Sequence, residues 1–147
     1  MVHALRGIWR VLAGRGILVD LRPLSGQCPI ELVSASTVVH IGEVDATGMA
    51  ADDAASDRAV QDAVTQGHFL ARQDSQFDFD LYWDNVQEMA SFMGSSRRMK
   101  QVRPSYADLE KAYLVLSAEG PERVRLRCRR RTTLAVYRKA DDSKFEY

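Results

Sequence analysis

The fold is decided by the stretch Leu5-Arg-Gly-Ile-Trp-Arg-Val-Leu12, Ala13-Gly-Arg-Gly16, Ile17-Leu-Val-Asp-Leu-Arg-Pro23. Apolar residues recur at helical spacing over residues 2–13, which predicts a helix with one apolar face. The two glycines end that helix, and the apolar run at 17–21 predicts a short strand. Because the run is nearly continuous rather than alternating, we expect a strand buried on both faces, as in a parallel sheet. Helix, glycine turn and buried strand form the second half of a βαβ unit.

The remaining elements follow from periodicity and from turn residues. Residues 68–83 alternate between apolar and polar side chains, which indicates a half-buried strand. We expect strands at 30–33, 37–44, 68–83 and 122–138, and helices over 52–66, 84–94 and 105–119. The stretch 95–104 is expected to be a basic loop and 140–147 a frayed tail, and residues 1–147 are expected to form a single domain.

Composition excludes several classes of protein. The chain has 147 residues, 20 basic and 20 acidic side chains, a net charge of zero and two cysteines. These values exclude a disordered chain, a collagen-like repeat and a disulfide scaffold. No apolar run approaches the roughly 18 residues of a membrane span, and the N-terminus is too interrupted by Arg and Gly for a secretory signal. We therefore expect a cytoplasmic protein without a membrane segment.

Five arginines occupy alternate positions of the last expected strand, from Arg123 to Arg131. Such a row is typical of a nucleic-acid surface, but the strand at 68–83 carries Asp74, Asp78 and Asp80 on its polar face. If the two strands pair antiparallel, opposite charges meet across the pair and contribute roughly 0.2–1 kcal/mol each. We favour this cross-strand pairing and consider nucleic-acid binding unlikely, with an RNA-associated factor as the weakest alternative.

The stretch 5–23 resembles one segment of the class I S-adenosylmethionine-dependent methyltransferases. In that family a helix ends in Arg-Val-Leu-Lys-Pro-Gly-Gly before the fifth strand; Arg10-Val-Leu12 and Gly16 match, whereas Ala13-Gly-Arg15 departs from the pattern. The resemblance implies an α/β chain, α+β-like as truncated, that corresponds to the C-terminal half of the family fold. Its small mixed sheet would keep the strand order 5-7-6, with a hairpin insertion and four or so packing helices.

The cofactor half of the family fold has no counterpart in this sequence. Members of the family hold S-adenosylmethionine on a glycine-rich loop after the first strand, whereas the nine glycines of this chain are scattered and form no such loop. We expect no cofactor site in the isolated chain; S-adenosylmethionine is implied only by the resemblance. The chain is then a methyltransferase-like fragment or half-subunit, inactive alone, and the sequence leaves its status as an enzyme open.

Removal of the neighbouring strand would leave Ile17–Leu21 at the edge of the sheet. An apolar, uncovered edge favours pairing with another chain. We expect a homodimer, or a complex with an N-terminal half, through Ile17–Leu21 and the helix that carries Trp9. The alternative function is a stand-alone dimeric interaction module without catalysis.

The candidate substrate-binding residues are Asp20, Arg22, His40, Tyr82 and Trp83. Asp20 and Arg22 end the strand at 17–21, and ligands of open α/β sheets bind beyond the carboxyl ends of strands. A local ion pair explains both residues equally well. His40 is more simply a strand histidine, and the aromatic pair is more simply core. No catalytic residue is identified and no metal site is expected, because the histidines lack ligand spacing and Cys28 and Cys128 have no CxxC partner.

Overall fold

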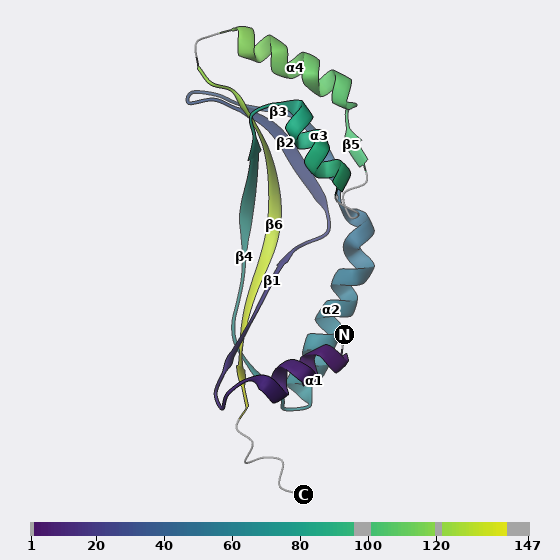
Figure 1. The fold of residues 1–147 in the computed structure, drawn as a ribbon, viewed down its shortest axis with the longest axis vertical. Helices are drawn as coiled ribbons and strands as arrows, with labels where there is room; N and C mark the ends of the chain where they lie inside the picture. The colour runs from purple at the N-terminus through teal and green to yellow at the C-terminus, as the bar shows by residue number, and fades with distance from the viewer. Residues whose placement is uncertain (1, 96–100, 120–121, 141–147) are drawn as a thin grey trace, which may run out of the picture. The chain divides into compact units, whose positions relative to one another are not determined.

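The computed structural model describes residues 2–95, 101–119 and 122–140 (Figure 1). The described residues form four α-helices, a short 3-10 helix and six strands. The helices are α1 (Val2–Val11), α2 (Ala50–Thr65), α3 (Val86–Ser95) and α4 (Tyr106–Ala118), with the 3-10 helix at Thr47–Met49; the strands are β1 (Ile17–Pro23), β2 (Gln27–Val33), β3 (Val38–Asp45), β4 (Phe69–Trp83), β5 (Gln101–Arg103) and β6 (Arg125–Lys139).

The strands form one sheet with the order β1-β6-β2-β3-β5, and β4 also pairs with β6. The sheet is antiparallel and is not closed into a barrel. The mixed α/β class and the four helices are confirmed. The expected small mixed sheet is instead a sheet of six antiparallel strands. In it β6 pairs with β1, β2 and β4, and the correspondence of β1, β6 and β4 to the family order 5-7-6 stays a prediction.

The expectation of a parallel strand buried on both faces is wrong. β1 pairs antiparallel with β6, from Ile17 opposite Arg138 to Pro23 opposite Thr132. Its burial alternates, and Ile17, Val19 and Leu21 are 61%, 54% and 58% exposed. A continuous apolar strand is buried on both faces only where other elements cover both faces of the sheet. The described residues cover only one face of β1.

The other elements lie close to their expected positions, with one exception. β5 falls inside the stretch 95–104 that was expected to be a loop, and it pairs with β3 at Glu43–Asp45. A strand of three residues carries too little periodicity to be recognised in a sequence. Of the expected tail, Ala140 is buried and its N–H donates to the carbonyl of His68, while 141–147 lie outside the described residues.

The chain divides into two compact units, to both of which β4 and β6 contribute residues. The first unit comprises Met1–Leu24, Ala50–Phe77 and Thr132–Tyr147. In it, α1 packs against α2, and Trp9 of α1 lies edge-on to His68 with ring centroids 5.3 Å apart. Lys139 lies 4.7 Å from the Trp9 ring centroid and donates to the carbonyl of Leu12 at 2.9 Å. These contacts anchor α1 to the end of β6.

The second unit comprises Ser25–Met49 and Asp78–Arg131 and contains the main hydrophobic core. The β2–β3 hairpin and the adjoining part of β6 supply the sheet side, and α3 and α4 supply the helical side. The side chains that are completely buried include Ile30, Val44, Met89, Leu109 and Leu126. This core fixes the β2–β3 hairpin and α4, which contribute to the lining of the cavity described below.

The arginine row of β6 pairs with acidic residues, as expected from the charges. Arg129 donates to Asp80 at 3.1 Å and Arg131 to Asp78 at 3.2 Å, both on β4. Arg127 donates to Glu31 of β2 at 2.7 Å. Arg123 and Arg125 both bond Asp84. The predicted cross-strand pairing is therefore confirmed for Asp78 and Asp80.

No helix among the described residues is both long and apolar enough to span a membrane. The expected cytoplasmic location stays a prediction.

Candidate functional site

The carboxyl end of β1 carries an ion-paired cluster in the first unit. The Arg22 Nε donates to both carboxylate oxygens of Asp20, at 2.9 and 3.0 Å, and its Nη2 donates to Asp57 of α2 at 2.7 Å. Residues of the same parity on a strand share a face, which places Asp20 and Arg22 beneath α2. Burial of the guanidinium acts against its charge, but the hydrogen bonds to Asp57 and Asp20 outweigh it and raise the pKa of Arg22.

Tyr137 belongs to the same side of the sheet. In the β1–β6 register Leu18 lies opposite Tyr137 and Asp20 opposite Ala135. Burial, together with the negative charges of Asp20 and Asp74, raises the pKa of Tyr137, so its hydroxyl stays protonated near neutral pH. The cluster therefore offers a fixed cation and a neutral hydroxyl. Its arginine is largely occupied by carboxylates, in agreement with the local ion pair considered for Asp20 and Arg22.

The structure separates the two candidate aromatic residues, although they are neighbours in sequence. Trp83 points into the core of the second unit, with its ring centroid 5.4 Å from that of Phe92. Tyr82 points to the other face and lies under Arg125, whose guanidinium carbon is 5.1 Å from the ring centroid. Successive residues of a strand face opposite sides of a sheet, so these two cannot line one pocket.

His40 lies on β3, opposite Glu31 of β2, and its side chain is exposed. Asp20 and Arg22 are thus brought together, Tyr82 and Trp83 are directed apart, and His40 stands on the surface. The five candidates do not converge on one site within either unit.

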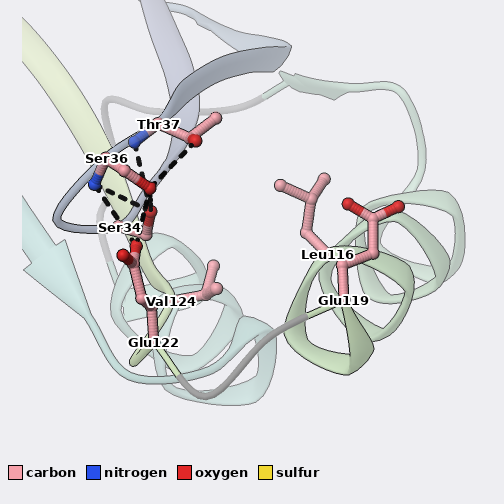
Figure 2. A pocket seen from close by; sticks show the side chains of 7 residues that line it. All are labelled: Ser34, Ser36, Thr37, Leu116, Glu119, Glu122 and Val124. Carbon is pink, nitrogen blue, oxygen red and sulfur yellow. Dashed lines mark hydrogen bonds between the residues drawn. The ribbon is translucent and has the colours of Figure 1, made fainter.

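A cavity of about 320 Å³ lies at the tip of the β2–β3 hairpin in the second unit. Figure 2 shows the hydroxyl side chains of the hairpin on one side and α4 on the other. The lining residues are Ser34, Ser36, Thr37, Leu116, Glu119, Glu122 and Val124. None of them was selected from the sequence.

The hydroxyls of the hairpin hold Glu122 in place. The Ser36 Oγ and backbone N–H both donate to Glu122 Oε2, at 2.8 and 3.3 Å. Hydrogen bonds from the Ser34 and Ser36 side chains lower the pKa of Glu122, so it is a fixed carboxylate at neutral pH. The serine-rich sequence 34–37 explains the tight turn, because Ser34 Oγ accepts the N–H groups of Ser36 and Thr37 at 3.3 and 3.2 Å. The hydroxyls of the cavity can donate and accept hydrogen bonds, and the Glu122 carboxylate already accepts one from the Ser36 hydroxyl.

The two cysteines, which are 100 positions apart in sequence, meet in the core of the second unit. Ile30 is opposite Cys128 in the β2–β6 register, so Cys28 lies diagonally across from Cys128 on the buried face. The hydrogen bond between the thiols, aided by Arg130, lowers the pKa of Cys28 to about 7, whereas the pKa of Cys128 is raised by the same bond and by burial. Both thiols are free, as expected from the sequence.

Sequence reasoning missed Asp57, Tyr137 and the lining of the hairpin cavity. Asp57 and Tyr137 become visible only through the strand register and the packing of α2. The run Ser34-Ala-Ser-Thr37 signals a turn, but nothing in the sequence indicates that Glu122 would meet it.

Within the described ranges, no group of three or more His, Cys, Asp or Glu side chains is arranged to hold a metal ion. Comparison with known proteins gives no match: no protein-family model, no curated protein and no solved structure is similar to this chain.

Proposed function

We propose that this chain is the substrate-side half of a class I S-adenosylmethionine-dependent methyltransferase fold and acts together with a partner half that holds the cofactor. The proposal starts from the resemblance over residues 5–23. The observation that carries it is the order β1–β6–β4, which equals the family order 5-7-6.

The exposure of β1 supports the proposal. Within the described ranges, β1 has one strand neighbour, β6, which leaves its second edge for another strand. The apolar side chains on one face of β1 are exposed, although an α/β fold normally covers both faces of its sheet with helices. A missing half of the fold accounts for both features.

In this proposal Asp20 and Arg22 border the substrate pocket, since they end the strand next to the missing half. The ion pairs with Asp20 and Asp57 hold Arg22 in place, and the partner supplies the glycine-rich loop. The chain alone has neither a cofactor site nor activity.

Two observations test the proposal. The genomic DNA on either side of the coding segment should encode, in frame or in a neighbouring gene, an apolar strand followed by a glycine-rich GxGxG loop. Calorimetric titration of S-adenosylmethionine into the purified chain should give no binding heat. Flanking DNA without such a segment, or binding by the chain alone, would overturn the proposal.

The second candidate is a stand-alone dimeric interaction module, which is favoured by the open edge of β1. Two β1 strands can pair edge to edge in a symmetric dimer. Light scattering coupled to size-exclusion chromatography distinguishes the candidates, because the module has twice the 16.5 kDa mass of one chain. A mass of one chain at all concentrations would exclude the module and leave the half-fold.

The predicted role of Trp9 in either interface needs revision. Its ring packs against His68 and Lys139 within the first unit. We therefore place the contact on β1 rather than on the Trp9 side of α1.

A further inference from the structure

The first unit has two unlike sheet faces. One face carries Asp20, Arg22 and Lys139, which contact α2 and α1. The opposite face is here called the open face. It is formed by Ile17, Val19, Leu21, Leu134, Val136 and Arg138, because Ile17 lies opposite Arg138, Val19 opposite Val136 and Leu21 opposite Leu134.

The open face is apolar along two neighbouring strands. Its β1 side chains are more than half exposed, and Leu134 and Val136 are partly buried beside them. On β4 the Ser75 hydroxyl donates to the Leu134 carbonyl at 3.4 Å, and Phe77, two residues further along β4, is also exposed. A contiguous apolar surface of this kind marks a contact site.

Arg138 ends this apolar surface. Its Nε is buried and has no hydrogen-bond partner among the described residues. The neighbouring basic side chains do have partners. Lys139 donates to the Leu12 carbonyl, and the arginines from Arg123 to Arg131 bond carboxylates or other groups. That nitrogen is enclosed within the chain, but the Arg138 side chain as a whole is partly exposed and forms no ion pair with the described residues. A carboxylate on an incoming group would therefore pair with its guanidinium.

We propose that an amphipathic helix of the partner half docks on the open face, with its apolar side on Val19 and Val136 and a carboxylate against Arg138. This inference rests on the proposed function and names the element and the charge that the partner supplies. A helix suits the surface because helices are the usual cover of a sheet face in α/β folds. A second copy stacked through the same face would bring a second Arg138, since none of the residues named for this face is acidic.

The proposal is tested with two synthetic amphipathic peptides of 18 residues or so, a length chosen to give about five helical turns. The peptides share one leucine-rich face and differ only in flanking glutamates or lysines. Fluorescence anisotropy should show that the acidic peptide binds the chain about tenfold more tightly, since the change replaces attraction by repulsion at Arg138.

Three variants locate the site. Val19→Asp should abolish binding of the acidic peptide, and Arg138→Glu should reverse the preference in favour of the basic peptide. Val38→Asp is the matched control, since Val38 is a strand valine that is also 54% exposed but belongs to the second unit. Circular dichroism melting checks that each variant is folded.

Equal binding of both peptides, no binding of either, or an undiminished affinity in Val19→Asp would overturn the docking proposal. A dimeric mass that Val19→Asp converts to a monomer would overturn it in favour of a second copy. None of these results bears on the flanking DNA or on the cofactor titration, so failure here is distinguishable from failure of the proposed function.

Discussion

At the residue scale, the ion pair between Arg127 and Glu31 is the best protected of the arginine row. The two side chains are 13% and 15% exposed, against 58% and 42% for Arg131 and Asp78. Solvent weakens exposed ion pairs to about 0–1 kcal/mol, whereas loss of one partner of a shielded pair costs more. Without the Glu31 carboxylate, Arg127 would keep the longer contact of its Nη1 with Asp80, at 3.7 Å. The hydrogen bond to Glu31 also raises the pKa of Arg127, so the guanidinium stays charged at all working pH values.

Glu31→Gln should therefore lower the free energy of unfolding by about 1–2 kcal/mol, while Asp78→Asn should change it by about 0.5 kcal/mol or less. Urea denaturation at neutral pH measures both. Equal effects of the two substitutions on the free energy of unfolding would show that the contribution of these ion pairs does not depend on their burial.

The lowered pKa of the Cys28 thiol predicts that the stability of the chain depends on pH. Cys28 has a pKa of about 7 in the folded chain against an ordinary 9.0, so the folded state releases a proton earlier than the unfolded state. The contribution of Cys28 to the free energy of unfolding is therefore fully present above pH 9, and it is lost as the pH falls through 7. The pKa of Cys128 is raised in the folded chain, so Cys128 lowers the free energy of unfolding as the pH rises above 9.

Urea denaturation between pH 6.5 and 8.5 should accordingly show stability that rises with pH, and Cys28→Ser should flatten this rise. Thiolate absorbance near 240 nm should reveal one ionisation near pH 7 that Cys28→Ser removes. Thiols that both titrate near pH 9 in the folded chain would contradict the coupling.

At the element scale, the approach of β5 to β3 depends on one glycine. A Cβ at Gly42 would overlap the carbonyl oxygen of Arg103 and approach Pro104 Cδ to 2.8 Å. Gly42 therefore allows β5 to pair along Glu43–Asp45 and to complete the sheet of the second unit.

Gly42→Ala should destabilise the chain by about 1–3 kcal/mol through this overlap. Gly48→Ala is the matched control, because nothing lies within 4 Å of a Cβ at that position. Thermal unfolding compares the two, and an unchanged melting temperature for Gly42→Ala would show that β5 can move away without cost.

Local patterns predicted most elements but not their partners. The alternation over residues 68–83 and the capping residue Ser105, whose hydroxyl accepts the Asp108 N–H at 3.3 Å, were sufficient to place β4 and α4. The run 17–21 was assigned as a strand but given the wrong environment, because burial depends on layers that the run does not encode. The pairing of β4 with β6 could be predicted, because strands that pair carry side chains of opposite charge on the faces that meet, and these charges are visible in both sequences.

The candidate site was harder to predict than the elements. The local ion pair of Asp20 and Arg22 was one of two alternatives given equal weight, and the structure contains it, since a separation of two residues on a strand places both on one face. The contact between Glu122 and Ser36 joins residues 86 positions apart, and no short-range signal predicts such a contact. The same holds for Cys28 and Cys128.

At the scale of the whole molecule, two units of different character share β4 and β6. The second unit has a closed hydrophobic core with helices packed on it. The first unit has helices on one face, an open apolar face and an unpaired edge of β1 among the described strands. This contrast supports the proposal that the first unit is completed by a partner.

Calorimetric titration of S-adenosylmethionine into the chain, after it has been reunited with the polypeptide encoded beside it, tests the proposed half-fold directly. We predict one binding site per complex, no binding by the chain alone, and loss of binding when Val19→Asp prevents assembly. A reunited complex that binds no S-adenosylmethionine, or an isolated chain that does, would contradict the account.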